Sequence, residues 1–104
     1  MKKSRLALSD AAIADILEQA DWYTSQSGEA LARRWEKAVT GAVLRILKAP
    51  AAGAPCSFKS HNLRHVRRTI ITGFPKHLLF YRFRNNELLI LRVVHGARDL
   101  ENLF

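Results

Sequence analysis

Two apolar runs near the carboxyl end of the chain alternate in the way that is typical of β-strands. The first run ends at Arg84, the second begins at Glu87, and Asn85 and Asn86 lie between them. Asparagine tolerates the positive φ angles of a tight two-residue turn, so the stretch from 74 to 100 predicts a β-hairpin followed by a short charged tail. Because both faces of the hairpin are mostly apolar, we expect it to lie at the centre of its sheet.

The asparagine turn also predicts how the two strands pair. In this register Tyr81 faces Ile90, and Leu79 faces Arg92. Alternation then sorts the side chains onto two faces of the hairpin. One face carries Leu79, Tyr81, Phe83, Leu88, Ile90, Arg92 and Val94, and the other carries Leu78, Phe80, Arg82, Leu89, Leu91, Val93 and His95. Helices can cover one of these faces, and what covers the other is the functional question.

The first half of the chain predicts a short strand over residues 3–8 and then two helices. Ser9 is a suitable N-cap for a helix that begins at Asp10. Ser27 can cap a second helix from about residue 29 to residue 49, where Pro50 ends it. The expected inner stripes are Ile13, Ile16, Leu17, Ala20 and Tyr23 in the first helix, and Leu31, Trp35, Ala38, Val39, Ala42, Val43 and Ile46 in the second. Asp15, Glu18 and Trp22 are expected on the opposite side of the first helix.

The middle of the chain predicts a long loop and one more strand. Residues 51–62 have no periodicity, and residues 63–72 alternate, with Arg68 and Ile70 on one face and Arg67 and Ile71 on the other. The element order is β-α-α-β-β-β. It predicts an α+β fold in which a two-helix hairpin packs on one face of an antiparallel sheet. A chain of 104 residues is expected to form a single domain over residues 1–104.

The charge of the chain indicates a polyanionic or acidic partner, such as nucleic acid, the ribosome, an acidic protein or an anionic membrane. The net charge is +8, and most of the cations of the second half are arginines, which suit contacts to phosphates and carboxylates. The single cysteine, Cys56, excludes an internal disulfide. The sequence contains no run of about 18 apolar residues, so we expect a cytoplasmic protein without a membrane partner.

Several of these features, in this order along the chain, resemble the ParE/RelE toxin superfamily, and within it the ParE branch of plasmid stabilisation toxins. The last of them follows directly on the final strand and is the most specific. They are Leu8-Ser9, Pro50, Arg67-Arg68, Phe74-Pro75, Tyr81-Arg82 and the run His95-Gly96-Ala97-Arg98-Asp99. The resemblance covers nearly the whole chain.

The resemblance implies the toxin component of a type II toxin–antitoxin system, neutralised by an acidic antitoxin. ParE-type members inhibit DNA gyrase by binding it, and this is the expected function. The first alternative is a RelE-like endonuclease that cuts mRNA on the ribosome without a metal. The second is an antitoxin-binding module that has lost its toxicity. In each case the antitoxin is expected to join the chain into a homo- or hetero-oligomer.

The sequence predicts no cofactor and no metal site, because His61, His65, His77 and His95 lack the paired spacing of zinc ligands. For an endonuclease the candidate catalytic residues are His95, Arg98 and Arg82. Arg82 and His95 share one predicted face, whereas Tyr81 points to the other, which weakens a Tyr/Arg/His cluster. His95 can instead hold the turn of the tail, and Arg98 and Asp99 can form a local ion pair.

Two groups of residues are predicted to bind protein partners. Arginines within apolar strands are costly unless they meet anions, and we favour acidic antitoxin residues as those anions over a solvated basic face. The predicted antitoxin-binding residues are Arg67, Arg68, Arg82, Phe80, Leu89 and Leu91. The predicted target-binding residues are His95, Arg98 and Asp99 in the tail.

Overall fold

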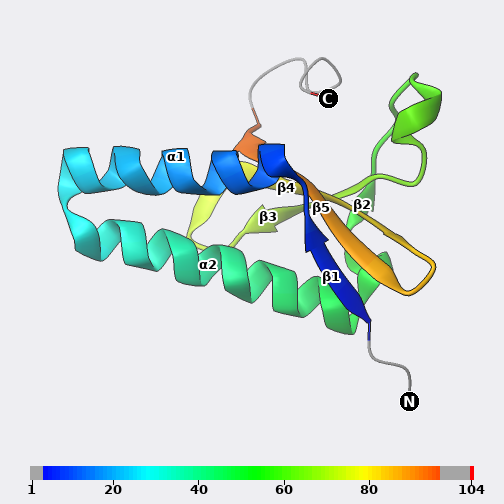
Figure 1. The fold of residues 1–104 in the computed structure, drawn as a ribbon, viewed down its shortest axis with the longest axis horizontal. Coiled ribbons are helices and arrows are strands. Elements are labelled where there is room, and N and C mark those ends of the chain that lie inside the picture. The colour runs from blue at the N-terminus through cyan, green and yellow to red at the C-terminus, as the bar shows by residue number, and fades with distance from the viewer. Residues whose placement is uncertain (1–3, 97–103) are drawn as a thin grey trace.

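The computed structural model describes residues 4–96 and residue 104, and its elements form two layers. The elements are strand β1 (Arg5–Leu8), helices α1 (Asp10–Ser27) and α2 (Glu29–Lys48), strand β2 (Ala54–Pro55), and strands β3 (Arg67–Ile71), β4 (Phe74–Arg84) and β5 (Glu87–His95). Single 3-10 turns lie at Pro50–Ala52 and His61–Leu63. The strands form one sheet in the order β1-β5-β4-β3-β2. Both helices cover the same face of it (Figure 1), so the α+β fold with a helical hairpin on one face is confirmed.

The sheet is mixed, whereas an antiparallel sheet was expected. β1 runs parallel to β5, with Arg5 opposite Glu87, and the other neighbouring strands are antiparallel. Parallel pairing is open to β1 because the helical hairpin and three strands separate it from β5 in sequence. The predicted loop also contributes β2, where Ala54 lies opposite Arg68.

The β4–β5 hairpin lies at the centre of the sheet, as predicted. Asn85 and Asn86 form its turn with φ angles of 52° and 60°, which is the left-handed geometry of a tight hairpin. Arg84 lies opposite Glu87, as expected from the turn. This half of the hairpin therefore has the predicted register.

A β-bulge changes the register farther along the hairpin. Leu79 lies opposite Val93 and not opposite Arg92, and the shift makes Leu91 the extra residue of β5. As a result Val93 is buried in the core and Val94 is only half-buried. The predicted faces of Val93 and Val94 were therefore wrong, because one extra residue reverses the alternation of all the residues that follow it.

The side chain of Asp15 occupies the edge of β5 next to the bulge. Its carboxylate accepts hydrogen bonds from Arg92 Nε at 2.7 Å and Arg92 Nη2 at 2.8 Å, and a third from the backbone N–H of Val93 at 3.0 Å. The hydrogen bond to Asp15 is the main cause that raises the pKa of Arg92. One carboxylate thus satisfies a guanidinium and a strand-edge amide, and it fixes α1 to β5.

The start of α1 is attached to the same strand. The Ser9 hydroxyl accepts from the N–H of Ala12 at 3.0 Å, as predicted for an N-cap, and donates to the carbonyl oxygen of Leu91 at 2.7 Å. The Ser9 N–H donates to the carbonyl oxygen of Ile90. The cap therefore continues the pairing of β1 with β5 into the first turn of the helix.

The two helices bury different amounts of their predicted stripes. In α2 the stripe is confirmed, and its Trp35 is fully buried and donates from Nε1 to the carbonyl oxygen of Ile16 at 3.1 Å. In α1 the predicted Ala20 is buried and the predicted Ile16 and Tyr23 pack against the core, but the predicted Ile13 and Leu17 are 43% and 57% exposed. α1 is rotated relative to the prediction because the attachment of Asp15 to β5 turns that side of the helix toward the sheet.

Tyr81 holds the segment after α2 against the sheet. Its hydroxyl donates to the carbonyl oxygen of Pro50 at 2.7 Å and accepts from the N–H of Gly53 at 2.9 Å. Burial raises the pKa of Tyr81, so the phenol stays protonated and can donate. A Cβ atom at residue 53 would overlap the Tyr81 hydroxyl, so only glycine fits there. Nη1 of Arg67 donates to the Gly53 carbonyl oxygen at 2.7 Å and completes the attachment.

We expect Asp15→Ala to lower the free energy of unfolding by about 2–4 kcal/mol, because it removes the Asp15 hydrogen bonds of a partly buried guanidinium and of a backbone amide. The Asp15 and Arg92 side chains are 11% and 21% exposed. The control is Arg33→Ala, which removes the surface ion pair with Glu29 and should cost less than about 0.5 kcal/mol. Urea unfolding followed by circular dichroism measures both. Equal losses in the two variants would contradict the role given to Asp15.

Candidate functional site

The sheet face away from the helices carries two of the predicted arginines among apolar side chains. We call it the open face and define it by the cross-strand pairs Arg68–Phe80, Ile70–Leu78, Leu78–Val94 and Arg82–Leu89. Arg68 is exposed and Arg82 is half-buried, and Ile70 is 54% exposed. Cations and apolar groups thus alternate over a surface that the helices leave uncovered (Figure 1).

Phe80 lies on the open face but is fully buried. Its ring lies 6.2 Å from that of Phe58, which belongs to the loop between β2 and β3, and 5.4 Å from that of Phe104, the last residue of the chain. The rings of Phe58 and Phe104 are 5.5 Å apart. An approaching partner therefore meets Phe58 and Phe104 before it meets Phe80.

The neighbouring arginines of β3 lie on opposite faces of the sheet. Arg67 pairs with Tyr81 on the helix side and donates to the carbonyl oxygens of Ala51 and Gly53. Arg68 lies on the open face, with its Nη1 3.8 Å from the sulfur of Cys56. Arg67 thus has a structural role in holding the loop, and Arg68 is the arginine of β3 that a partner can reach.

A small basic pocket opens at the turn end of the hairpin. It has a volume of about 150 Å³ and is lined by Arg5, Arg82, Arg84 and Glu87. Three guanidinium groups around one hollow favour an anionic occupant such as a carboxylate. Sequence reasoning missed Arg5 here, because only the parallel pairing of β1 with β5 brings it opposite Glu87, whose other neighbour is Arg84.

His95 lies on the helix side of the sheet and not on the face of Arg82, as was predicted. The bulge places it directly opposite His77, with 5.6 Å between the ring centroids. His77 is 8% exposed and packs on Trp35 at 4.8 Å. The remaining tail candidates, Arg98 and Asp99, lie outside the described residues.

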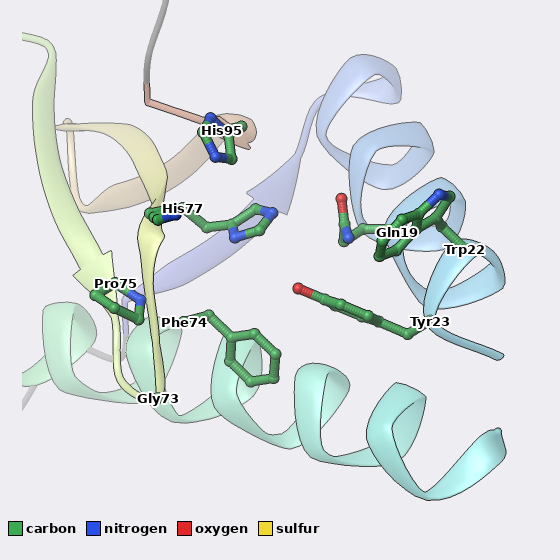
Figure 2. Close-up of a pocket in the computed structure, with 9 residues that line it drawn as sticks. Gln19, Trp22, Tyr23, Gly73, Phe74, Pro75, His77 and His95 are labelled. Carbon is green, nitrogen blue, oxygen red and sulfur yellow. The ribbon is translucent and has the colours of Figure 1, made fainter. Parts of the chain in front are cut away.

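The histidine pair belongs to a cavity that sequence reasoning did not find. This aromatic pocket, with a volume of about 570 Å³, is lined by Gln19, Trp22, Tyr23, Phe74, His77 and His95, among others. Figure 2 shows the α1 side chains on one side of it and those of the β4–β5 hairpin on the other. The run Phe74 to His77 and the exposed Trp22 were visible in the sequence, but the bulge that brings His95 to them was not.

Burial lowers the pKa of His77, and the charge on His95 lowers it further. His77 is therefore neutral in the fold at neutral pH, and its ring can pack on Trp35 without the cost of burying a charge.

No cluster that joins the predicted catalytic groups forms in the described part of the chain. The Tyr81 hydroxyl is engaged in the fold, and Arg82 and His95 lie on opposite faces. Within residues 4–96, no three histidine, cysteine or carboxylate side chains are grouped so that they could hold a metal ion. None of the helices of this described range is both long and apolar enough to cross a bilayer.

The sequence matches a family model described as the ParE toxin of type II toxin–antitoxin systems over residues 6–100. The chain belongs to the ParE toxin family. The resemblance found on the sequence motifs is thereby confirmed. No protein of curated function matches the sequence.

Solved toxin structures have the same fold as this ParE-family chain. A chain of the chromosomal ParDE system from P. aeruginosa is 20% identical with a TM-score of 0.72, over 88% of this chain and 95% of the other. A YoeB/ParE toxin from Agrobacterium tumefaciens is 14% identical with a TM-score of 0.57, over 88% and 96%. The isolated RelE toxin from E. coli is 10% identical with a TM-score of 0.55, over 96% and 93%. At these identities the similarity establishes the fold.

We expect the stability of this ParE-family chain to fall as the pH drops below about 6.5, the ordinary pKa of histidine. In that range His77 is protonated in the unfolded chain but stays neutral in the folded chain, because its pKa is lowered in the fold. Acid favours the state that binds more protons, which here is the unfolded state. Thermal melts between pH 7.5 and pH 5 measure the effect, and His77→Gln should flatten the slope. The control His61→Gln, at an exposed position, should keep the wild-type slope. A wild-type slope in His77→Gln would contradict the assignment.

Proposed function

We propose that this chain is a toxin that inhibits DNA gyrase by binding it, and that an acidic antitoxin neutralises the toxin by covering the open face. The observation that carries the antitoxin part is the position of Arg68 and Arg82 among apolar side chains on a face that the helices leave uncovered. Membership of the ParE family supports the toxin role and the gyrase target. The tail residues His95, Arg98 and Asp99 are proposed as target contacts.

The chemistry of the open face supports an acidic occupant. Leu89 is partly buried beside Arg82, and a partner that covers both must bury the guanidinium with the leucine. Burying a guanidinium is costly unless an anion pairs with it. A partner segment that carries a carboxylate between apolar side chains can pair with Arg82 and pack on Leu89 at the same time. The pocket of Arg5, Arg82 and Arg84 extends this preference to the turn end of the hairpin. The net charge of +8 favours the same class of partner at long range.

The alternative function is a RelE-like mRNA endonuclease, for which His95, Arg82 and Arg98 remain the candidate groups. The shared fold with the isolated RelE toxin is the observation in its favour. Against it, the Tyr81 hydroxyl is hydrogen-bonded to the carbonyl oxygen of Pro50, and Arg82 lies on the face opposite to His95. A second alternative is an antitoxin-binding module without toxicity, for which expression without the antitoxin would leave growth normal.

We expect the purified chain to inhibit gyrase supercoiling of plasmid DNA and to cause cleaved gyrase–DNA complexes to accumulate. Gel assays of supercoiling and of linearised plasmid measure the two effects. The matched assay is translation on purified ribosomes with a primer-extension readout of the mRNA. Intact supercoiling together with cut mRNA would overturn the gyrase proposal in favour of the endonuclease.

We expect Arg68→Glu combined with Arg82→Glu to weaken antitoxin binding by about a hundredfold or more, because each change replaces an attractive charge by a repulsive one. The antitoxin to test is a small acidic protein, which we expect to be encoded next to this chain. Isothermal titration calorimetry measures the affinity. The control is Arg34→Glu with Lys37→Glu, an equal charge change at exposed positions of α2. An unchanged affinity in the first variant, or an equal loss in both, would show that the open-face arginines make no specific contact.

A further inference from the structure

The aromatic pocket has rigid walls and an exposed rim. Tyr23, on α1, lies 5.5 Å from the ring of Phe74, and Phe74 lies 5.2 Å from the buried Trp35. Trp22 lies at the rim, 5.6 Å from Tyr23, and is 56% exposed. Rings fixed in this way lose little freedom on binding, which is the property of sites that receive a bulky side chain.

Polar groups face this cavity without partners of their own. The Tyr23 hydroxyl and the Gln19 side-chain amide have no hydrogen-bond partner among the described residues. Figure 2 shows both directed toward the hairpin, where the imidazoles of His77 and His95 lie. An apolar cavity with a few convergent polar groups is the usual composition of a binding site.

The pocket continues around the end of the sheet to the open face. A second hollow of about 480 Å³ shares Pro75, Lys76 and His95 with the aromatic pocket and adds Leu78 and Gly96. Leu78 belongs to the open face, where it pairs with Ile70 and Val94. An extended segment that covers the open face can therefore reach the aromatic pocket by passing Lys76.

We propose that the aromatic pocket receives a bulky apolar or aromatic side chain of the acidic antitoxin, from the same segment that covers the open face. The cavity accepts such a side chain, and the exposed Lys76 and His95 at its rim suit a carboxylate next to it in the partner sequence. The segment is thereby anchored at both ends of the sheet, by Arg82 and Arg84 at the turn end and by Trp22 at the other. The inference rests on the proposed antitoxin and adds a second contact to it.

The test is calorimetric titration of the chain with the acidic protein that we expect to be encoded beside it. Trp22→Ala removes the exposed ring at the rim of the pocket and should weaken binding by about tenfold or more, because tryptophan is enriched among the residues that dominate binding energy. Gln19→Trp fills the cavity and should also weaken binding, whereas Trp22→Phe keeps a ring and should retain most of the affinity. The matched control is Leu44→Ala, which truncates an apolar side chain of α2 that is 54% exposed and lines none of these pockets. Thermal melts confirm that each variant is folded.

Each outcome decides the inference. Wild-type affinity in both Trp22→Ala and Gln19→Trp overturns it. Loss of gyrase inhibition with antitoxin affinity intact assigns the pocket to the target and overturns it. A change of sedimentation in the free chain with antitoxin affinity intact assigns the pocket to a second copy and also overturns it. If the wild-type chain does not bind an acidic protein from the adjacent reading frame, the proposal of an antitoxin partner is wrong. That result differs from one in which the wild type binds and the pocket variants bind equally well, which contradicts only the pocket contact.

Discussion

The contact of Asp15 with the bulge of β5 determines how the rest of the molecule is arranged. The bulge adds one residue to β5, and the Asp15 carboxylate supplies an acceptor for the amide of Val93 at the strand edge beyond the end of β1. The bulge also places Val93 in the core and His95 beside His77. Bulges often redirect side chains in this way. The same contact sets the rotation of α1, and with it the position of Trp22 over the aromatic pocket.

The sequence predicted the parts of the fold that depend on local chemistry. Asn85 and Asn86 indicated the turn because few residues accept two successive positive φ angles, and Ser9 indicated a helix start because its hydroxyl can accept from an N–H two or three residues into the helix. The bulge could not be predicted in this way. It depends on a carboxylate 77 residues away in the sequence, and alternation alone gives no sign of one extra residue. The faces of Val93, Val94 and His95 were missed for that reason.

The candidate site was predicted less well than the fold, because residue type did not reveal which arginine is used for folding. Arg67 and Arg68 are adjacent and chemically identical, yet the first hydrogen-bonds the backbone at Gly53 and the second lies on the open face. The difference arises from Tyr81, which pairs with Arg67 and holds Pro50 and Gly53 within its reach. Alternation within residues 63–72 placed the two arginines on opposite faces, but it did not show which of these faces meets the loop. That information enters only when the loop after α2 folds onto β3.

The burial of Phe80 changes the role that it can have in a complex. Phe58 and Phe104 already cover its ring, so an antitoxin segment that follows the open face either packs on those two rings or displaces them. In the first case Phe80 acts through the rings that it supports. In the second, the partner must replace the apolar contacts that it removes, and the net gain is smaller than the buried area suggests. In both cases a substitution at Phe80 would alter folding and any binding together, whereas Arg68 and Arg82 lie at positions that the core does not need.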